Sequence, residues 1–167
     1  MGGLGSGRSS GWRTKPTVEN YCCLDVRYLH KVGYLNSACA GSLTWKNRAG
    51  EQTGAIHLAT TKEYVRLIYR HRREGKEWKD VEETVPLEWT RCHYGSTRPW
   101  FLCPGVVNGR TCWRRVAILY DAGAYFLCRQ CYRLTYESRR EGLLDRSMRK
   151  TRKIRARLGV SANLHEP

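Results

Sequence analysis

The chain has no hydrophobic run that approaches the roughly 20 apolar residues a membrane-spanning helix requires. Its first residues are rich in glycine and lack the apolar segment of a secretory signal. Acidic residues are scarce, with 15 Asp and Glu against 30 Lys and Arg, so the net charge is +15. The first two absences predict a reducing, cytoplasmic environment without a membrane anchor. In that environment the eight cysteines are expected to bind metal more often than to form disulfides.

The positive charge is unevenly distributed along the 167 residues. Residues 18–90 carry eleven Lys and Arg against ten acids, whereas residues 91–134 carry seven against one and residues 135–167 nine against four. This concentration predicts a polyanionic partner, and nucleic acid is the commonest polyanion. A generally basic surface is the alternative, but it would not leave a stretch as long as 18–90 almost neutral.

Four cysteines in the second half of the chain have the spacing of a zinc ribbon. Cys128 and Cys131 form a C-x2-C pair directly after the apolar residues 125–127, and such a tight turn lets both sulfurs reach one metal ion. Cys112 precedes Cys128 with fifteen residues between them, which lies within the spacing of ribbon-type sites. We therefore predict a Zn²⁺ site formed by these three cysteines and Cys103.

The first half of this predicted site departs from the usual spacing. Eight residues separate Cys103 from Cys112, where two to four are usual, so the loop is expected to bulge outward and return. Turn-forming residues within 104–109 make such an excursion plausible. Cys92 or His93 could replace Cys103 or Cys112 as a ligand, and buried structural thiols are the other alternative.

The predicted fold class is α+β: a small antiparallel β module with short N-terminal helices, a zinc ribbon and a C-terminal basic helix. Helical signals begin at Thr17 and again at Asp25, which is expected to cap a helix that Gly33 ends. The predicted segments are a flexible Gly/Ser-rich basic arm over 1–16, the helix and β module over 17–90, the ribbon over 91–136, the basic helix over 137–160 and a tail over 161–167.

Alternating apolar residues predict strands in both the β module and the ribbon. Along residues 63–71 we expect Tyr64 and Arg66 to face inward and Val65, Leu67 and Tyr69 to face outward. The predicted strand pairs are 43–45 with 55–58, 63–71 with 81–89, and 114–120 with 125–127.

Exposed cations of the basic segments are the predicted contacts with phosphate groups. The C-terminal helix, expected to end at Leu158, has only a thin apolar stripe, which would leave most of its cations in water. The predicted nucleic-acid-binding residues are Arg8, Arg13, Arg110, Arg114, Arg115, Arg129, Arg133, Arg139, Arg140, Arg146, Arg149, Lys150, Arg152, Lys153, Arg155 and Arg157.

Several motifs spread over most of the chain also point to a family. They are Met1-Gly-Gly-Leu-Gly-Ser-Gly-Arg8, Arg98-Pro-Trp-Phe-Leu-Cys-Pro104, Arg114-Arg-Val116, Tyr125-Phe-Leu-Cys-Arg-Gln-Cys-Tyr132 and Leu134-Thr-Tyr-Glu-Ser138. With them the chain resembles short zinc-ribbon proteins of bacterial genomes, phages and other mobile elements, most of them known only as hypothetical proteins. The resemblance implies a bacterial or phage cytoplasmic protein and supplies no activity. Its members have a tighter first cysteine pair than this chain.

We expect a non-enzymatic nucleic-acid-binding protein of a phage or mobile element, which grips the phosphate backbone with its ribbon and C-terminal helix. DNA is favoured over RNA as the partner, and the sequence leaves both open. The alternative is an interaction or anti-defence protein that binds and modulates a host protein or nucleoprotein complex. An enzyme is not expected, because Asp121 is the only acid in residues 91–134 and an all-cysteine metal site has no open position.

Overall fold

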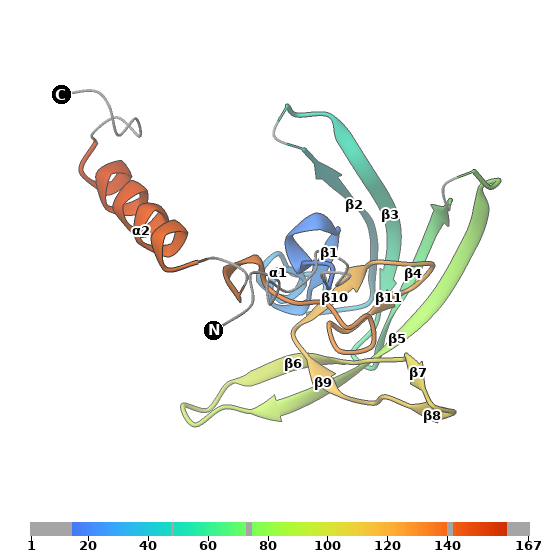
Figure 1. Cartoon of the computed structure of the whole chain (residues 1–167). Coiled ribbons are helices and arrows are strands. Elements are labelled where there is room, and N and C mark those ends of the chain that lie inside the picture. Colours follow the sequence, from blue (N-terminus) through green and yellow to red (C-terminus); the bar gives the residue numbers. More distant parts are fainter. Residues whose placement is uncertain (1–14, 48, 73–74, 140–141, 160–167) are drawn as a thin grey trace.

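The computed structural model describes residues 15–47, 49–72, 75–139 and 142–159 (Figure 1). Its largest element is a curled, six-stranded antiparallel sheet. In sheet order the strands are β2 (Cys39–Lys46), β3 (Gln52–Thr60), β4 (Tyr64–His71), β5 (Lys79–Arg91), β6 (Thr97–Leu102) and β9 (Arg115–Val116). A three-stranded sheet places β10 (Ile118–Asp121) between β1 (Cys23–Asp25) and β11 (Phe126–Leu127), and β7 (Val106–Val107) pairs with β8 (Arg110–Thr111).

Helices are few in the described residues. They are the 3-10 turns η1 (Val18–Asn20) and η2 (Glu137–Arg139), the six-residue α1 (Val26–Lys31) and the 15-residue α2 (Leu143–Arg157). Asp25 caps α1 as expected, since its carboxylate accepts a hydrogen bond from the Arg27 N–H at 2.9 Å. The molecule is mostly antiparallel β with one substantial helix at its C-terminal end, so the predicted α+β class with N-terminal helices is not confirmed.

The hairpins of the β module form as the alternation predicts, but in β4 the buried and exposed sets of residues are the reverse of those predicted. Leu43 pairs with Ile56 in β2–β3, and β4 pairs with β5 from Tyr64 opposite Pro86 onward. In β4 it is Val65, Leu67 and Tyr69 that are buried, while Arg66 is exposed. The prediction of Tyr64 and Arg66 as inward residues was wrong. Folding buries apolar surface, so the apolar side chains of this strand face the core and the charged Arg66 stays in water.

Strand β5 joins the β module to the ribbon. Its first part pairs with β4, and from Leu87, opposite Phe101, it pairs with β6. Pro86, which has no N–H to donate, lies at this changeover. The predicted boundary between residues 90 and 91 falls within β5, and buried residues from both sides share one core that includes Val85, Phe101, Cys103, Phe126 and Cys128.

The predicted strand over 114–120 is broken at Ala117. The Ala117 carbonyl accepts a hydrogen bond from the Val26 N–H at 3.0 Å, where α1 begins. On one side of this break β9 joins the six-stranded sheet, and on the other β10 pairs with β1 and with β11. The predicted return hairpin is present, with Tyr120 opposite Leu127.

Helix α2 lies away from the sheets (Figure 1). The apolar stripe that the sequence predicts along it is exposed, with relative exposures from 42% for Met148 to 81% for Leu144. The helix therefore presents both its apolar and its basic side to the surroundings in this structure.

Candidate metal centre and basic surfaces

The four cysteines that the spacing singled out lie together. Their Sγ atoms are all within 4.8 Å of one another, and among the described residues they are the only group of this kind. The sulfur–sulfur distances are 3.7 Å for Cys103–Cys131, 3.9 Å for Cys112–Cys128 and 3.6 Å for Cys128–Cys131. Metal–sulfur bonds of about 2.3 Å in a tetrahedron would separate the sulfurs by about 3.8 Å. The cluster therefore has dimensions at which it could hold a metal ion.

The long gap between Cys103 and Cys112 is taken up by the β7–β8 hairpin. Its turn residues Asn108 and Gly109 both have positive φ, at 52° and 75°, as a two-residue hairpin turn requires. The Cys112 N–H then donates to the Gly105 carbonyl at 2.7 Å, which returns the chain to the cluster. The excursion predicted from the sequence is thus a small hairpin that brings the two sulfurs back to the same point.

Gly105 is a residue of this site that the spacing alone did not identify. It is buried, and a Cβ atom added to it would lie 2.9 Å from the Cys131 Sγ atom. Only a glycine leaves room for the sulfur there. The turn-forming Pro-Gly sequence after Cys103 was the available signal, but it does not reveal which side chain approaches.

Hydrogen bonds within the cluster separate the acidities of its thiols. The pKa of Cys128 is lowered because its thiolate accepts a hydrogen bond from the Cys103 thiol, and the same contact raises the pKa of Cys103. Burial raises the pKa of Cys131 to about 12. Since metal ligands are deprotonated cysteines, a bound cation would displace the thiol protons and make binding pH dependent.

Cys92 and His93 do not belong to this group. The Cys92 N–H donates to the Ser96 carbonyl at 2.7 Å in the β5–β6 turn, and the His93 ring packs edge-on against Tyr94 at 5.5 Å. Neither residue is among the four whose ligand atoms converge.

Three of the five predicted ribbon arginines have partners within the protein. Arg114 Nη1 lies 3.9 Å from Cys112 Sγ, and Arg115 forms an ion pair with Glu88 at 3.3 Å. Arg129 donates to the Leu134 carbonyl at 3.1 Å and lies over the Tyr136 ring at 5.2 Å. All three line a recess of about 370 Å³ next to Cys128. Because four thiolates around a divalent cation leave an excess of negative charge, the guanidinium of Arg114 would also stabilise a loaded centre.

Arg27 lines the same recess and was not predicted. It is held by Asp25 at 2.6 Å and reaches the ribbon because β1 pairs with β10. Local sequence gives no signal for this neighbour, since the pairing joins segments far apart in the chain.

The remaining predicted contacts fall into three groups. Arg110 is exposed on β8, and Arg133 is exposed in the turn after Cys131 with a φ of 52°. Arg8, Arg13 and Arg140 lie outside the described residues. Arg139 is the last residue of η2, and the other predicted contacts, on α2, are Arg146, Arg149, Lys150, Arg152, Lys153, Arg155 and Arg157.

Comparisons with protein-family models, with curated proteins and with solved structures found no match for this chain. Within the described residues, every helix is too short or too polar to cross a lipid bilayer.

Proposed function

We propose that the chain is a non-enzymatic, zinc-dependent nucleic-acid-binding protein of a phage or mobile element, in which a cysteine-held zinc ion stiffens the ribbon and α2 grips the phosphate backbone. Zinc is favoured because tetrahedral sites with four thiolates suit Zn²⁺ and iron–sulfur centres, and zinc needs no redox partner. The sulfur separations of 3.6–3.9 Å support a single ion rather than a larger cluster.

The observation that carries the nucleic-acid proposal is the exposed basic face of α2. Residues three and four apart share one side of a helix, and the cations follow that spacing. The face comprises Arg146, Arg149, Lys150, Lys153 and Arg157, all of them exposed. We call these five residues the α2 basic face. Asp145 is the only acid in the helix.

The length of α2 suits a phosphate backbone. At about 1.5 Å per residue its 15 residues extend about 22 Å, a length over which duplex DNA presents phosphates every few ångströms. Binding at such a face releases condensed counterions, so affinity should fall about 10³-fold between 50 and 200 mM salt for six contacts. DNA is our preferred target, with RNA as the second.

The test compares two variants that lose the same charge. In the first, all five residues of the α2 basic face are changed to Gln. In the matched control, five exposed lysines of the near-neutral segment are changed to Gln, namely Lys31, Lys46, Lys62, Lys76 and Lys79.

Binding of duplex DNA, single-stranded DNA and RNA is measured by fluorescence anisotropy over a salt series with zinc present. We expect the first variant to lose most of its affinity, with the salt slope reduced by about four to five. The lysine control should lose little. Equal losses would mean that total charge alone drives binding, and salt-insensitive binding would instead favour a protein partner.

A further inference from the structure

A large cleft opens where the two hairpins of the β module separate. Strands β3 and β4 pair only from His57 opposite Ile68 to Thr60 opposite Val65. Beyond this ladder β2–β3 and β4–β5 diverge (Figure 1), and the cleft between them has a volume of about 990 Å³. Its lining includes the start of β3, the end of β4 and residues of the β10–β11 hairpin.

The inner wall of the cleft is aromatic. Trp45 stacks on Phe126 with ring centroids 6.0 Å apart and planes 25° from parallel, and Tyr69 meets Phe126 edge-on at 5.4 Å. At the rim Trp78 is 52% exposed, with the Arg72 guanidinium 4.9 Å from its ring centroid. Phe126 and Tyr69 are only 1% and 6% exposed, so Trp78 is the ring of this lining with the most surface open to a planar heterocycle.

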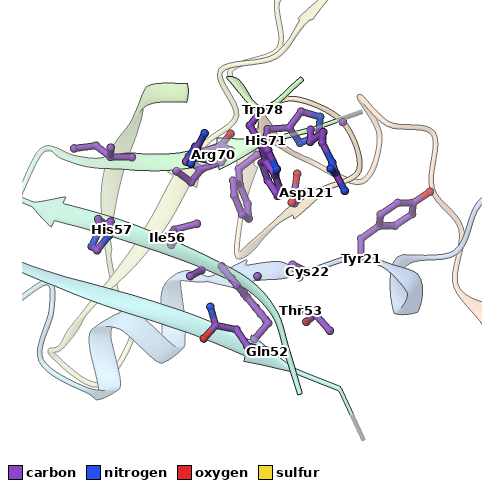
Figure 2. Close-up of a pocket in the computed structure, with 18 of the residues that line it drawn as sticks. Tyr21, Cys22, Gln52, Thr53, Ile56, His57, Arg70, His71, Trp78 and Asp121 are labelled. Atoms are coloured by element: carbon purple, nitrogen blue, oxygen red, sulfur yellow. The ribbon is translucent and has the colours of Figure 1, made fainter. Parts of the chain in front are cut away.

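Two polar atoms of the cleft lining are left unpaired within the part of the chain that the structure describes. His71 Nε2 and Asp121 Oδ1 are buried, and neither has a hydrogen-bond partner among the described residues. Figure 2 shows the two side chains near one another, across the cleft from Gln52 and Thr53. Buried polar atoms are rarely left without a hydrogen-bond partner, so these two atoms call for an explanation. A carboxylate oxygen accepts a hydrogen bond, and an imidazole nitrogen can donate or accept one.

The cleft also contains a cysteine, Cys22, but its chemistry does not favour catalysis. Burial and the neighbouring Asp121 carboxylate raise the pKa of Cys22, so the thiol stays protonated near neutral pH. A thiol is a much weaker nucleophile than a thiolate. The cleft is therefore better suited to binding than to covalent chemistry.

We propose that this cleft binds one unpaired nucleobase with an amino-bearing edge. The base would stack on Trp78, its N–H groups would donate to Asp121, and a ring heteroatom or carbonyl would face His71. Guanine presents adjacent N–H donors beside a carbonyl acceptor, so it should bind best, and uracil or thymine, which has no amino group, least. Arg72 lies at the rim, where the attached phosphate would emerge.

The base can come from a single strand or from a free nucleotide. The first source rests on the proposed function, and the second does not. A strand held by the α2 basic face would bring many bases within reach of the protein, whereas a free nucleotide would need the cleft alone.

The experiment uses the whole chain loaded with zinc and two cleft variants, Trp78→Ala and Asp121→Asn, with Tyr94→Ala as the control. Tyr94 is 95% exposed and does not line the cleft, so its removal matches the loss of an exposed ring at Trp78. Binding of GMP, CMP, AMP and UMP is measured by calorimetry, and binding of G-rich and T-rich single strands and a duplex by anisotropy.

We expect GMP to bind best and both cleft variants to weaken GMP and G-rich strand binding about tenfold, while the control leaves them unchanged. Duplex binding should be unaffected, because its bases are already paired. Because Trp78 is an exposed rim residue, Trp78→Ala is expected to fold normally. It therefore still tests the site if Asp121→Asn fails to fold.

The failures can be distinguished. If both cleft variants bind GMP and G-rich strands like the wild type, the base site is overturned while binding through α2 stands. If GMP binding depends on Trp78 and Asp121 but no polynucleotide binds at low salt, the cleft is a free-nucleotide site and the proposed nucleic-acid function fails. If no mononucleotide and no single strand binds better than duplex, the base site is also overturned.

Discussion

Residues 91–134 and α2 each carry seven Lys and Arg, but the surroundings of these cations differ. Around the ribbon, Arg114, Arg115 and Arg129 contact a sulfur, a carboxylate and a carbonyl of the protein itself. On α2 the basic face is exposed on a helix that lies away from the sheets. To bind a phosphate, Arg114, Arg115 and Arg129 must give up these partners, so each new contact contributes less binding free energy. We therefore expect the three ribbon arginines to contribute mainly to the structure, and the proposed function places phosphate binding on the exposed face of α2.

Loss of a cysteine of the cluster should have the largest effect on the ribbon. Cys128 is 1% exposed and belongs to the same core as Phe101 and Phe126, so Cys128→Ser should lower the free energy of unfolding by about 4 kcal/mol or more. Urea melts with zinc present measure this loss. Cys92→Ser, outside the cluster, is the control and should change stability by less than about 0.5 kcal/mol. Equal melting midpoints for the two variants would show that the cluster is only a group of buried thiols.

Matched triple variants test the comparison of the two basic regions. Arg114, Arg115 and Arg129 changed together to Gln should weaken DNA binding less than Arg146, Arg149 and Arg157 changed together to Gln. We expect the α2 triple variant to reduce the salt slope by about three, and the ribbon triple variant to reduce it by clearly less.

Anisotropy titrations in excess zinc measure both slopes without interference from metal loss. A larger effect of the ribbon triple variant would reverse the assignment, and the recess beside Cys128 would then become the main phosphate site.

The packing around Gly105 should give an intermediate effect. In Gly105→Ala the new methyl group meets Cys131 Sγ at 2.9 Å, so we expect a loss of about 1–3 kcal/mol in stability together with weaker zinc retention against a chelator. Gly109→Ala is the comparison, since Gly109 has a φ of 75° but open space around it. It should cost only about 1 kcal/mol and leave zinc retention unchanged. Identical zinc retention in the two variants would rule out contact with the sulfur as the cause.

The pH dependence that arises from Glu83 should be the smallest effect. Its carboxylate accepts hydrogen bonds from Tyr69 Oη and the Phe126 N–H, both at 2.8 Å, and burial raises its pKa above the ordinary value of 4.5. The folded chain then binds the proton more tightly than the unfolded chain. The free energy of unfolding therefore decreases as the pH rises from 4.5 through the raised pKa, and the loss is complete above it.

Glu83→Gln keeps an oxygen acceptor for both donors but cannot ionise. In urea melts at several pH values in excess zinc, the wild type should lose more stability than this variant as the pH rises. Parallel curves would mean that Glu83 has an ordinary pKa in the folded chain.

The sequence allowed the parts of the fold that depend on local pattern to be predicted. The capping by Asp25, the β2–β3 and β4–β5 hairpins and the four cysteines that converge all follow from spacing or alternation. The break at Ala117 and the passage of β5 into the ribbon could not be predicted in this way, because both depend on pairing between distant segments.

The cleft could not be predicted for the same reason. His71 is on β4 and Asp121 on β10, and each residue alone resembles an ordinary polar residue near a turn. Only the divergence of the hairpins and the packing of β10–β11 bring them to one cavity. The apolar stripe of α2 was visible in the sequence, but its exposure depends on where the helix lies.

Native mass spectrometry of the purified chain shows whether the four cysteine sulfurs hold one metal ion. We expect one zinc ion per chain, with the mass reduced by the protons lost from the thiols, and no retained zinc in Cys128→Ser. A chain that carries no metal, or a Cys128→Ser variant that retains zinc as the wild type does, would show that the four cysteines are not a metal site.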